Sequence, residues 1–256
     1  MLKENTIKIF EKSFIDNWEL PALSDYNEKT TMTYGDFARD IARVHLFYEQ
    51  SGIKPGDKVA LIGKNTPMWV TVYMATITYG AVIVPILQEF NPTDAQHIVN
   101  HSEAVLLFAS KAIWESLDFD QLHRIRAVIS LDSRQLLAEK PGETVSKVIY
   151  DLSRQFEERY KSGFYRNDIH YADVPGDQLM ELNYTSGTTG FSKGVMLTGN
   201  NLCGNIVYGI NSGLHYKGSR CLSFLPLAHA YGCAFDMLTP LAVGSHITLL
   251  GRIPSP

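Results

Sequence analysis

The segment from Tyr184 to Val195 combines the residue types that bind phosphate. Its order is Tyr184-Thr185-Ser186-Gly187-Thr188-Thr189-Gly190-Phe191-Ser192-Lys193-Gly194-Val195. Glycines let backbone N–H groups come close to phosphate oxygens and form a concavity that binds anions. Hydroxyl groups donate hydrogen bonds or coordinate Mg²⁺, and a lysine supplies positive charge where negative charge shifts between oxygens. The segment therefore predicts a phosphate-binding loop.

This loop differs from the two commonest phosphate-binding motifs. A Walker A loop has its lysine between a glycine and a serine or threonine, whereas Lys193 lies between Ser192 and Gly194. The Rossmann spacing also fails, because Gly187 and Gly190 are three residues apart. An ordinary flexible turn is the plain alternative, but it requires neither the hydroxyls nor the lysine.

Hydrolase chemistry has weaker support. Ser186 is not part of a G-x-S-x-G elbow. His229 with Cys221 or Cys233 would form a nucleophile pair, but cysteines among apolar residues are usually inert core residues. The three cysteines, which include Cys203, form no CxxC pair. We therefore expect reduced thiols in a cytoplasmic protein, with neither a disulfide framework nor a zinc site.

Composition places the chain among ordinary globular proteins. Of 256 residues, 45% are apolar and 20% charged, and 23 basic against 27 acidic residues give a net charge of −4. A nucleic-acid partner is not expected, because the sequence has no strongly basic balance. The apolar stretch 70–87 is interrupted by threonines, a glycine and a proline, so it predicts no membrane span. Peripheral membrane contact and a homodimer remain open.

Helical and strand patterns alternate along the chain. We expect strands at 58–62, 81–86, 104–108, 127–131, 179–184, 221–225 and 246–250. Helices are expected at 7–18, 33–50, 91–101, 112–117, 198–211 and 231–241, with another opening at Thr66-Pro67. Thr33 and Asp36 form a predicted capping box. The alternation predicts an α/β fold with mostly parallel sheets flanked by helices.

A polar segment separates two parts of the chain. Residues 133–177 predict a solvated helix followed by a loop at 163–176. We therefore assign residues 1–175 to a first α/β part and 176–256 to the start of a second, which carries the phosphate loop between a predicted strand and a helix that begins near Thr198.

The phosphate loop resembles the signature of adenylate-forming, or AMP-binding, enzymes, which is close to Y-T-S-G-T-T-G-x-P-K-G-V. Ser192 replaces the usual proline, a change that acts mainly through chain entropy and is typically worth under ~1 kcal/mol. Weaker elements occur in the family's order. They are Thr33–Phe37, Gly52–Leu61, Tyr79–Ile86 and Leu225–Gly232, the last in a form usual for long-chain fatty acid:CoA ligases.

The resemblance implies an ATP-dependent ligase that joins a carboxylate to AMP, releases pyrophosphate and passes the acyl group to CoA. It assigns phosphate contacts to Thr185, Ser186, Gly187, Thr188, Thr189, Gly190 and Lys193. Thr188 would also lie near Mg²⁺, and Lys193 and His229 would serve catalysis. His229 would border the pocket for the acid, which the resemblance implies is a long-chain fatty acid, and Tyr231 with Phe235 would wall it. A core histidine and core aromatic residues are the structural alternatives.

The same resemblance implies elements that this sequence does not contain. There is no Y-G-x-T-E stretch for Mg²⁺, no T-G-D aspartate for the ribose, and no C-terminal domain with its lysine. We therefore expect a truncated N-terminal domain that is inactive by itself. A nucleotide- or phosphate-binding module without catalysis is the alternative, and it predicts tight ATP binding by these 256 residues.

Overall fold

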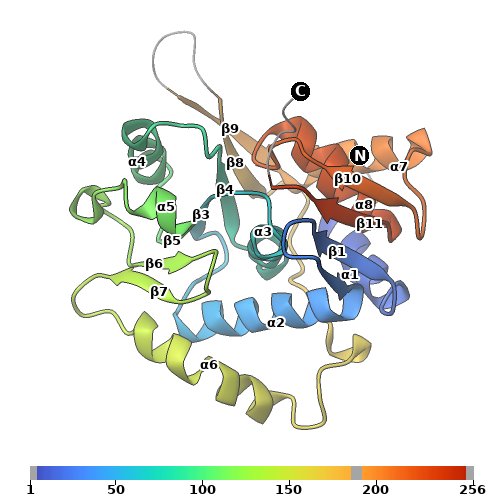
Figure 1. Ribbon diagram of the computed structural model, residues 1–256, viewed down its shortest axis with the longest axis horizontal. Coiled ribbons are helices and arrows are strands. Elements are labelled where there is room, and N and C mark those ends of the chain that lie inside the picture. The colour runs from blue at the N-terminus through green and yellow to red at the C-terminus, as the bar shows by residue number, and fades with distance from the viewer. Residues whose placement is uncertain (1–4, 186–191, 252–256) are drawn as a thin grey trace.

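Two β-sheets flanked by helices make up the computed structural model, which describes residues 5–185 and 192–251 (Figure 1). The seven-stranded sheet has the order β7-β6-β5-β3-β4-β8-β9. Its parallel strands are β3 (Lys58–Ile62), β4 (Val82–Ile86), β5 (Leu106–Ala109), β6 (Ala127–Ser130) and β8 (Leu179–Thr185). The edge strands β7 (Leu136–Glu139) and β9 (Lys193–Thr198) are antiparallel to their neighbours.

The four-stranded sheet has the order β10-β11-β1-β2. Its strands are β10 (Arg220–Ser223), β11 (His246–Leu249), β1 (Pro21–Asp25) and β2 (Thr30–Thr33). The first three are parallel, and β2 pairs antiparallel with β1. The predicted α/β class with mostly parallel sheets is therefore confirmed.

Each sheet combines strands from both sides of residue 175. In the larger sheet β8 pairs with β4, with Glu181 opposite Ile83. In the smaller sheet β1 pairs with β11, with Leu23 opposite Ile247. The sheets therefore do not divide at the boundary that the polar segment predicts.

The described residues contain eight α-helices, five of which begin after a residue whose side chain caps the first turn. They are α1 (Thr6–Asp16), α2 (Tyr34–Gln50), α3 (Pro67–Tyr79), α4 (Pro92–His101), α5 (Lys111–Trp114), α6 (Val145–Arg159), α7 (Gly199–Ser212) and α8 (Thr239–Val243). Short 3₁₀ turns lie at Phe119–Gln121 and Arg166–Asp168, and a π-helix, η3, covers Gly232–Leu238. Thr33 and Asp36 form the predicted capping box, and Thr66 caps α3 ahead of Pro67.

Helix α3 lies between the two sheets (Figure 1). Its sequence is apolar on every side, and ten of its thirteen residues are buried, including Trp69 and Tyr73. A helix without a polar face belongs in a core. Because α3 contacts β3, β4 and β1, it joins the two sheets into one packed unit.

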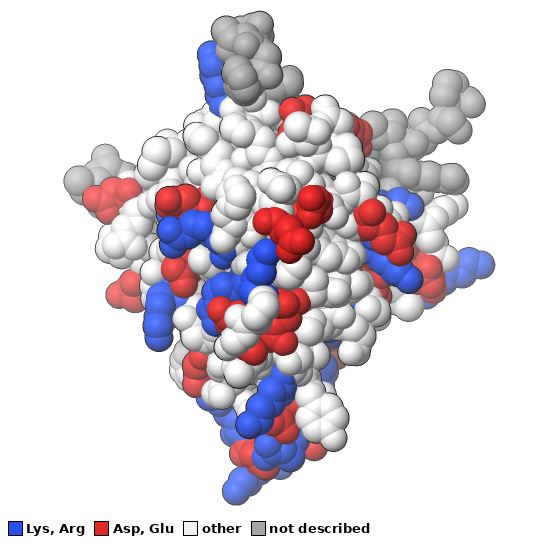
Figure 2. All heavy atoms as spheres, turned by 90° about the vertical axis from the view of Figure 1, so that its left-hand side faces the viewer, with Lys and Arg blue, Asp and Glu red and all other residues white. Residues whose placement is uncertain are grey.

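The surface carries mixed charge on the side of the molecule at the left of Figure 1. Figure 2 shows basic and acidic side chains interspersed there among the described residues. Ion pairs between surface side chains, such as Lys111 with Glu115, occur among the described residues. Within residues 5–185 and 192–251, no helix has the length and apolar character needed to cross a membrane.

Candidate functional site

The phosphate-loop sequence lies at the tip of a β-hairpin. Thr185 ends β8 and Lys193 begins β9, and the two residues are register partners. Both are exposed to solvent. The predicted phosphate contacts Ser186, Gly187, Thr188, Thr189 and Gly190 lie outside the described residues, and so does the predicted Mg²⁺ contact of Thr188. The structure thus brings Thr185 and Lys193 together at the base of the loop.

The helix predicted near Thr198 after this loop is confirmed. It is α7, which begins at Gly199, and Thr198 caps it through a capping box with Asn201. Strand β9, which was not predicted, lies between the loop and this helix. The pattern of β9 was missed because four of its six residues are exposed, so it lacks the apolar run of an interior strand.

The carboxyl ends of parallel strands from both sheets border one cavity. It has a volume of about 220 Å³ and is lined by Gly63 after β3, Leu87 after β4, Phe224 after β10 and Gly251 after β11. Because β8 is parallel to β4, its carboxyl end at Thr185 lies on the same edge of the larger sheet. Ligands of open α/β sheets bind in the crevice outside the carboxyl ends of the strands.

A turn carrying His229 closes one side of this cavity. The side chain of Asn65 makes two hydrogen bonds to the backbone of this turn. It donates to the carbonyl of Leu225 at 2.7 Å and accepts from the N–H of Leu227 at 3.2 Å. The turn residues Pro226 and Ala228 line the cavity. His229 itself is exposed, and its Nδ1 accepts from the N–H of Tyr231 at 3.3 Å. That contact requires the tautomer whose proton is on Nε2.

Asn183 connects the His229 turn to the strand that leads into the phosphate loop. Its side-chain amide donates to the carbonyl of Ala228 at 3.1 Å and to the carboxyl group of Glu181 at 2.8 Å. Asn183 lies two residues before Thr185 on β8. The two groups of predicted site residues, at the loop and at the turn, are therefore joined through one buried amide.

Glu181 is the centre of a buried polar cluster behind the site. It is fully buried, and it accepts hydrogen bonds from the hydroxyl of Tyr73 on α3 and from Asn183. The thiol of Cys233 on η3 donates to Tyr73 Oη at 3.2 Å. Burial raises the pKa of Glu181, while its hydrogen bonds oppose that rise. A cavity of about 20 Å³ adjoins Glu181, which is room for one water molecule.

The predicted aromatic wall lies partly at the surface. Tyr231 is 59% exposed, and its ring centroid is 5.0 Å from that of Phe235. Phe235 also contacts Tyr208, at 6.2 Å between ring centroids. These three rings form an exposed aromatic cluster beside the His229 turn. The assignment of Tyr231 and Phe235 to an acyl channel stays a prediction.

The cysteines are poorly suited to nucleophilic chemistry. Burial raises the pKa of Cys233 well above its usual value, and it raises the pKa of Cys221 to about 12. A thiol attacks as its thiolate, and a thiol with a raised pKa forms little thiolate at neutral pH. Within the described parts of the chain, no group of three or more histidine, cysteine or acidic side chains is arranged to hold a metal ion.

Asn65, Tyr73, Glu181 and Asn183 were not among the site residues predicted from the sequence. A signal for two of them exists, because Glu181 and Asn183 are polar residues on one face of an otherwise apolar strand. A charged side chain in such a strand is rare unless it is paired. Their partners on α3 and at Ala228 are distant in sequence and required the structure.

Known proteins with similar sequences indicate the family to which this chain belongs. The profile of the AMP-binding enzyme family matches residues 10–256. Long chain acyl-CoA synthetase 6, peroxisomal, from Arabidopsis thaliana is 28% identical over 211 residues, covering 81% of this chain and 29% of that protein. Fatty acyl-CoA synthetase A from Dictyostelium discoideum is 31% identical, and the match covers 80% of this chain and 30% of that protein. A feruloyl-CoA synthase from Amycolatopsis is 28% identical, and the match covers 86% of this chain and 39% of that protein.

Solved structures share the fold. A long-chain-fatty-acid-CoA ligase from Archaeoglobus fulgidus has a TM-score of 0.77 at 19% identity, covering 99% of this chain and 48% of that one. The N-terminal domain of FACL13 from Mycobacterium tuberculosis also has a TM-score of 0.77 at 19% identity, with 98% and 58% covered. The fold is thus that of the N-terminal domain of adenylate-forming enzymes.

The chain belongs to the AMP-binding enzyme family, as the match over residues 10–256 establishes. It spans less than a third of the length of the two fatty acyl-CoA relatives described above.

Proposed function

We propose that this chain is the N-terminal portion of an ATP-dependent acid:CoA ligase that activates a long-chain fatty acid as its acyl-adenylate. The observation that carries the proposal is the phosphate-loop sequence, with Thr185 and Lys193 paired and exposed at the carboxyl edge of the larger sheet. The base of this loop is open to a polyphosphate. The cavity of about 220 Å³ on the same edge offers space for part of the ligand.

The proposed chemistry divides between the two groups of site residues. ATP supplies the adenylyl group, and Mg²⁺, with Thr188 nearby, would offset charge on its phosphates. Lys193 would stabilise the negative charge that develops as pyrophosphate leaves. His229, with Nδ1 accepting from Tyr231, would present its Nε2–H toward the acid. Asn183, which donates to the carbonyl of Ala228, would fix the position of the His229 turn relative to the phosphate loop.

The fatty acid substrate rests on narrower support. The element Leu225–Gly232 resembles the form found in long-chain ligases, and relatives named for long-chain and fatty acyl-CoA synthesis align with most of this chain. A relative named for feruloyl-CoA synthesis aligns equally far. The experiment must therefore compare acids of both types.

The test follows acid-dependent release of pyrophosphate from ATP and Mg²⁺, with acetate, decanoate, palmitate and ferulate. It uses the 256-residue chain and the whole product of its gene. We expect release with palmitate by the whole product, and a loss of at least about 100-fold in kcat/KM with Lys193→Ala, which removes a transition-state charge contact. Lys147→Ala, an exposed residue on α6, should leave the rate unchanged.

Three outcomes would change the proposal. Release with ferulate in place of palmitate would retain the ligase and replace its substrate. No release with any acid, together with tight ATP binding, would favour a nucleotide-binding module without catalysis. Equal losses in Lys193→Ala and Lys147→Ala would remove the role of the lysine.

A further inference from the structure

A second cavity lies on a different part of the molecule. Its volume is about 350 Å³, and it is bordered by α2, α6, the start of α3 and the chain after β6. Apolar side chains form most of its wall, among them Phe47, Met68, Phe108, Ile129, Ile149 and Leu152. In Figure 1 α2 and α6 run along the bottom, while β8 and β9 lie in the upper part. The cavity is thus separate from the candidate site.

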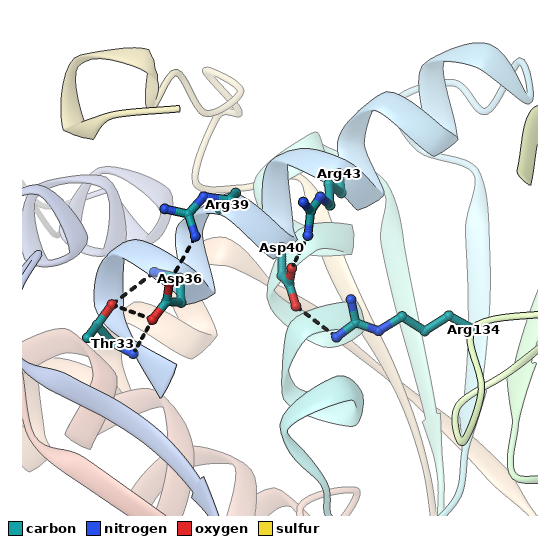
Figure 3. A network of polar contacts seen from close by, with 6 residues as sticks. All are labelled: Thr33, Asp36, Arg39, Asp40, Arg43 and Arg134. Carbon is teal, nitrogen blue, oxygen red and sulfur yellow. Dashed lines mark hydrogen bonds and ion pairs between the residues drawn. The ribbon is translucent and has the colours of Figure 1, made fainter. Parts of the chain in front are cut away.

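Charged side chains stand at the rim of this cavity. Figure 3 shows Asp40 on α2 between two arginines, accepting from Arg43 at 3.2 Å and from Arg134 at 2.8 Å. Asp40 is only 12% exposed, whereas the two arginine side chains are 45% and 51% exposed. Both guanidinium groups line the cavity, and each has N–H donors beyond the one used by Asp40.

The charge balance at the rim favours a monoanion. Two arginines against one aspartate leave one positive charge among the ionisable side chains that line the cavity. Asp40 restricts both guanidinium groups by accepting a hydrogen bond from each, from Arg43 on α2 and from Arg134 in the chain after β6. Arg43 also lies over the ring of Phe156, at 5.0 Å from its centroid, which further restricts it. Fixed guanidinium groups bind carboxylates with directed, charge-assisted hydrogen bonds.

The apolar wall defines the rest of the ligand. A volume of about 350 Å³ is near the lower end of small-molecule pockets, which span about 300–1,000 Å³. A ligand of medium chain length, such as decanoate, suits a pocket of that size. Its alkyl chain would contact the apolar wall, and its carboxylate would lie at the rim beside the unused guanidinium donors.

We propose that this cavity binds one alkyl monocarboxylate of medium chain length, with its carboxylate at Arg43 and Arg134. The site is distinct from the proposed adenylation site and does not depend on its activity. A simpler interpretation is that Asp40 and the arginines only fasten α2 to the chain after β6. The proposal predicts one ligand that contacts both the apolar wall and the arginines at the rim, whereas the simpler interpretation predicts no ligand.

The chain provides a matched control on the same helix. Arg39 pairs with Asp36 at 2.8 Å, one turn before the Asp40–Arg43 pair (Figure 3). The side chain of Arg39 is 38% exposed, close to the value for Arg43, but it does not line the cavity. Arg39→Met therefore removes the same charge from α2 without touching the proposed site.

The experiment measures binding of decanoate to the 256-residue chain by titration calorimetry. We expect saturable binding of one decanoate, with acetate and decan-1-ol at least about 10-fold weaker, because each lacks one half of the contacts. Arg43→Met and Arg134→Met should each weaken binding about 10-fold or more, whereas Arg39→Met should not. Ser153→Trp, which places a large ring at the rim, should abolish binding.

Thermal unfolding of each variant separates lost binding from lost folding. If Arg43→Met unfolds at a lower temperature, Arg134→Met and Ser153→Trp still test the site. His229→Ala distinguishes this cavity from the proposed acid pocket, since it should leave the decanoate affinity unchanged. Absence of saturable binding, equal binding of decan-1-ol, or equal losses in Arg39→Met and Arg134→Met would each overturn the proposal.

Discussion

Glu181 illustrates how one residue can depend on the whole fold. Its carboxyl group is fully buried, with Tyr73 and Asn183 as donors, and burial raises its pKa. In the unfolded chain the group ionises near its usual pKa of about 4.3. The unfolded state therefore loses its proton at a lower pH than the folded state does. Stability from this group is full below the unfolded pKa and falls as pH rises toward the folded pKa.

We predict that Glu181→Gln removes this loss of stability. Glutamine keeps the shape of the side chain and cannot ionise, so its free energy of unfolding relative to the native chain should improve as pH rises from 4 to 8. Urea unfolding of both proteins across that range measures the difference. Glu157→Gln, at an exposed position on α6, provides the control and should show no such trend. A constant difference for Glu181→Gln would mean that burial does not raise the pKa.

The candidate site shows what residue types can and cannot predict. Thr185 and Lys193 were predicted from the loop sequence, because glycines, hydroxyls and a lysine in one short segment have few other uses. Glu181 and Asn183 were not found, although both lie close to that loop in sequence. Their importance depends on α3 and the His229 turn packing on β8, and local pattern carries no information on those contacts.

At the scale of elements, local signals predicted the helices and interior strands well. The capping box of Thr33 and Asp36, and the buried runs of β3 and β4, are strong because each is complete within a few residues. Strands β1, β2, β7 and β9 were not predicted. All four pair antiparallel with a neighbour, and neither β2 nor β9 contains a buried residue, so neither shows a buried run.

The crossing of α7 and α8 provides a test of packing between elements. A Cβ atom built on Gly209 would lie 2.3 Å from Thr239 Oγ1 and 3.0 Å from Thr239 Cβ. Thr239 is fully buried, and its hydroxyl already donates to the carbonyl of Ala234 at 2.8 Å. We predict that Gly209→Ala destabilises the protein by about 1–3 kcal/mol, the usual cost of overpacking.

Gly204→Ala is the matched control on the same helix. A Cβ atom at Gly204 meets no other atom within 4 Å, so only backbone entropy changes. Alanine in a helix interior is favoured over glycine by about 0.5–1 kcal/mol, and Gly204→Ala should therefore stabilise the protein. Chemical unfolding of the two variants should give opposite signs. Two stabilising changes would show that the helices move apart at little cost.

At the scale of the molecule, the first and the last described elements of the chain pack into the same structure. Buried hydrogen bonds join Thr6 to the carbonyl of Gly199, Ser13 to that of Leu241 and Tyr34 to that of Ser245, at 2.6–2.7 Å. Strand β1 pairs with β11 across more than 200 residues of sequence. Such long-range pairings cost loop entropy and gain stability only when both partners are present.

This arrangement predicts that residues 1–175 will not fold alone, although the polar segment suggests an independent first part. Without residues 176–251, β4 loses β8 and β1 loses β11, which exposes an interior strand edge in each sheet. We expect the 1–175 chain to aggregate or to melt without a cooperative transition in circular dichroism, whereas the whole chain melts in one step. Refolding it together with residues 176–256 should restore that transition, since the two pieces supply complementary strands to both sheets. A cooperative melt of residues 1–175 by themselves would instead show that the larger sheet is stable with β4 at its edge, and that the strands after residue 175 add to a first part that is already folded.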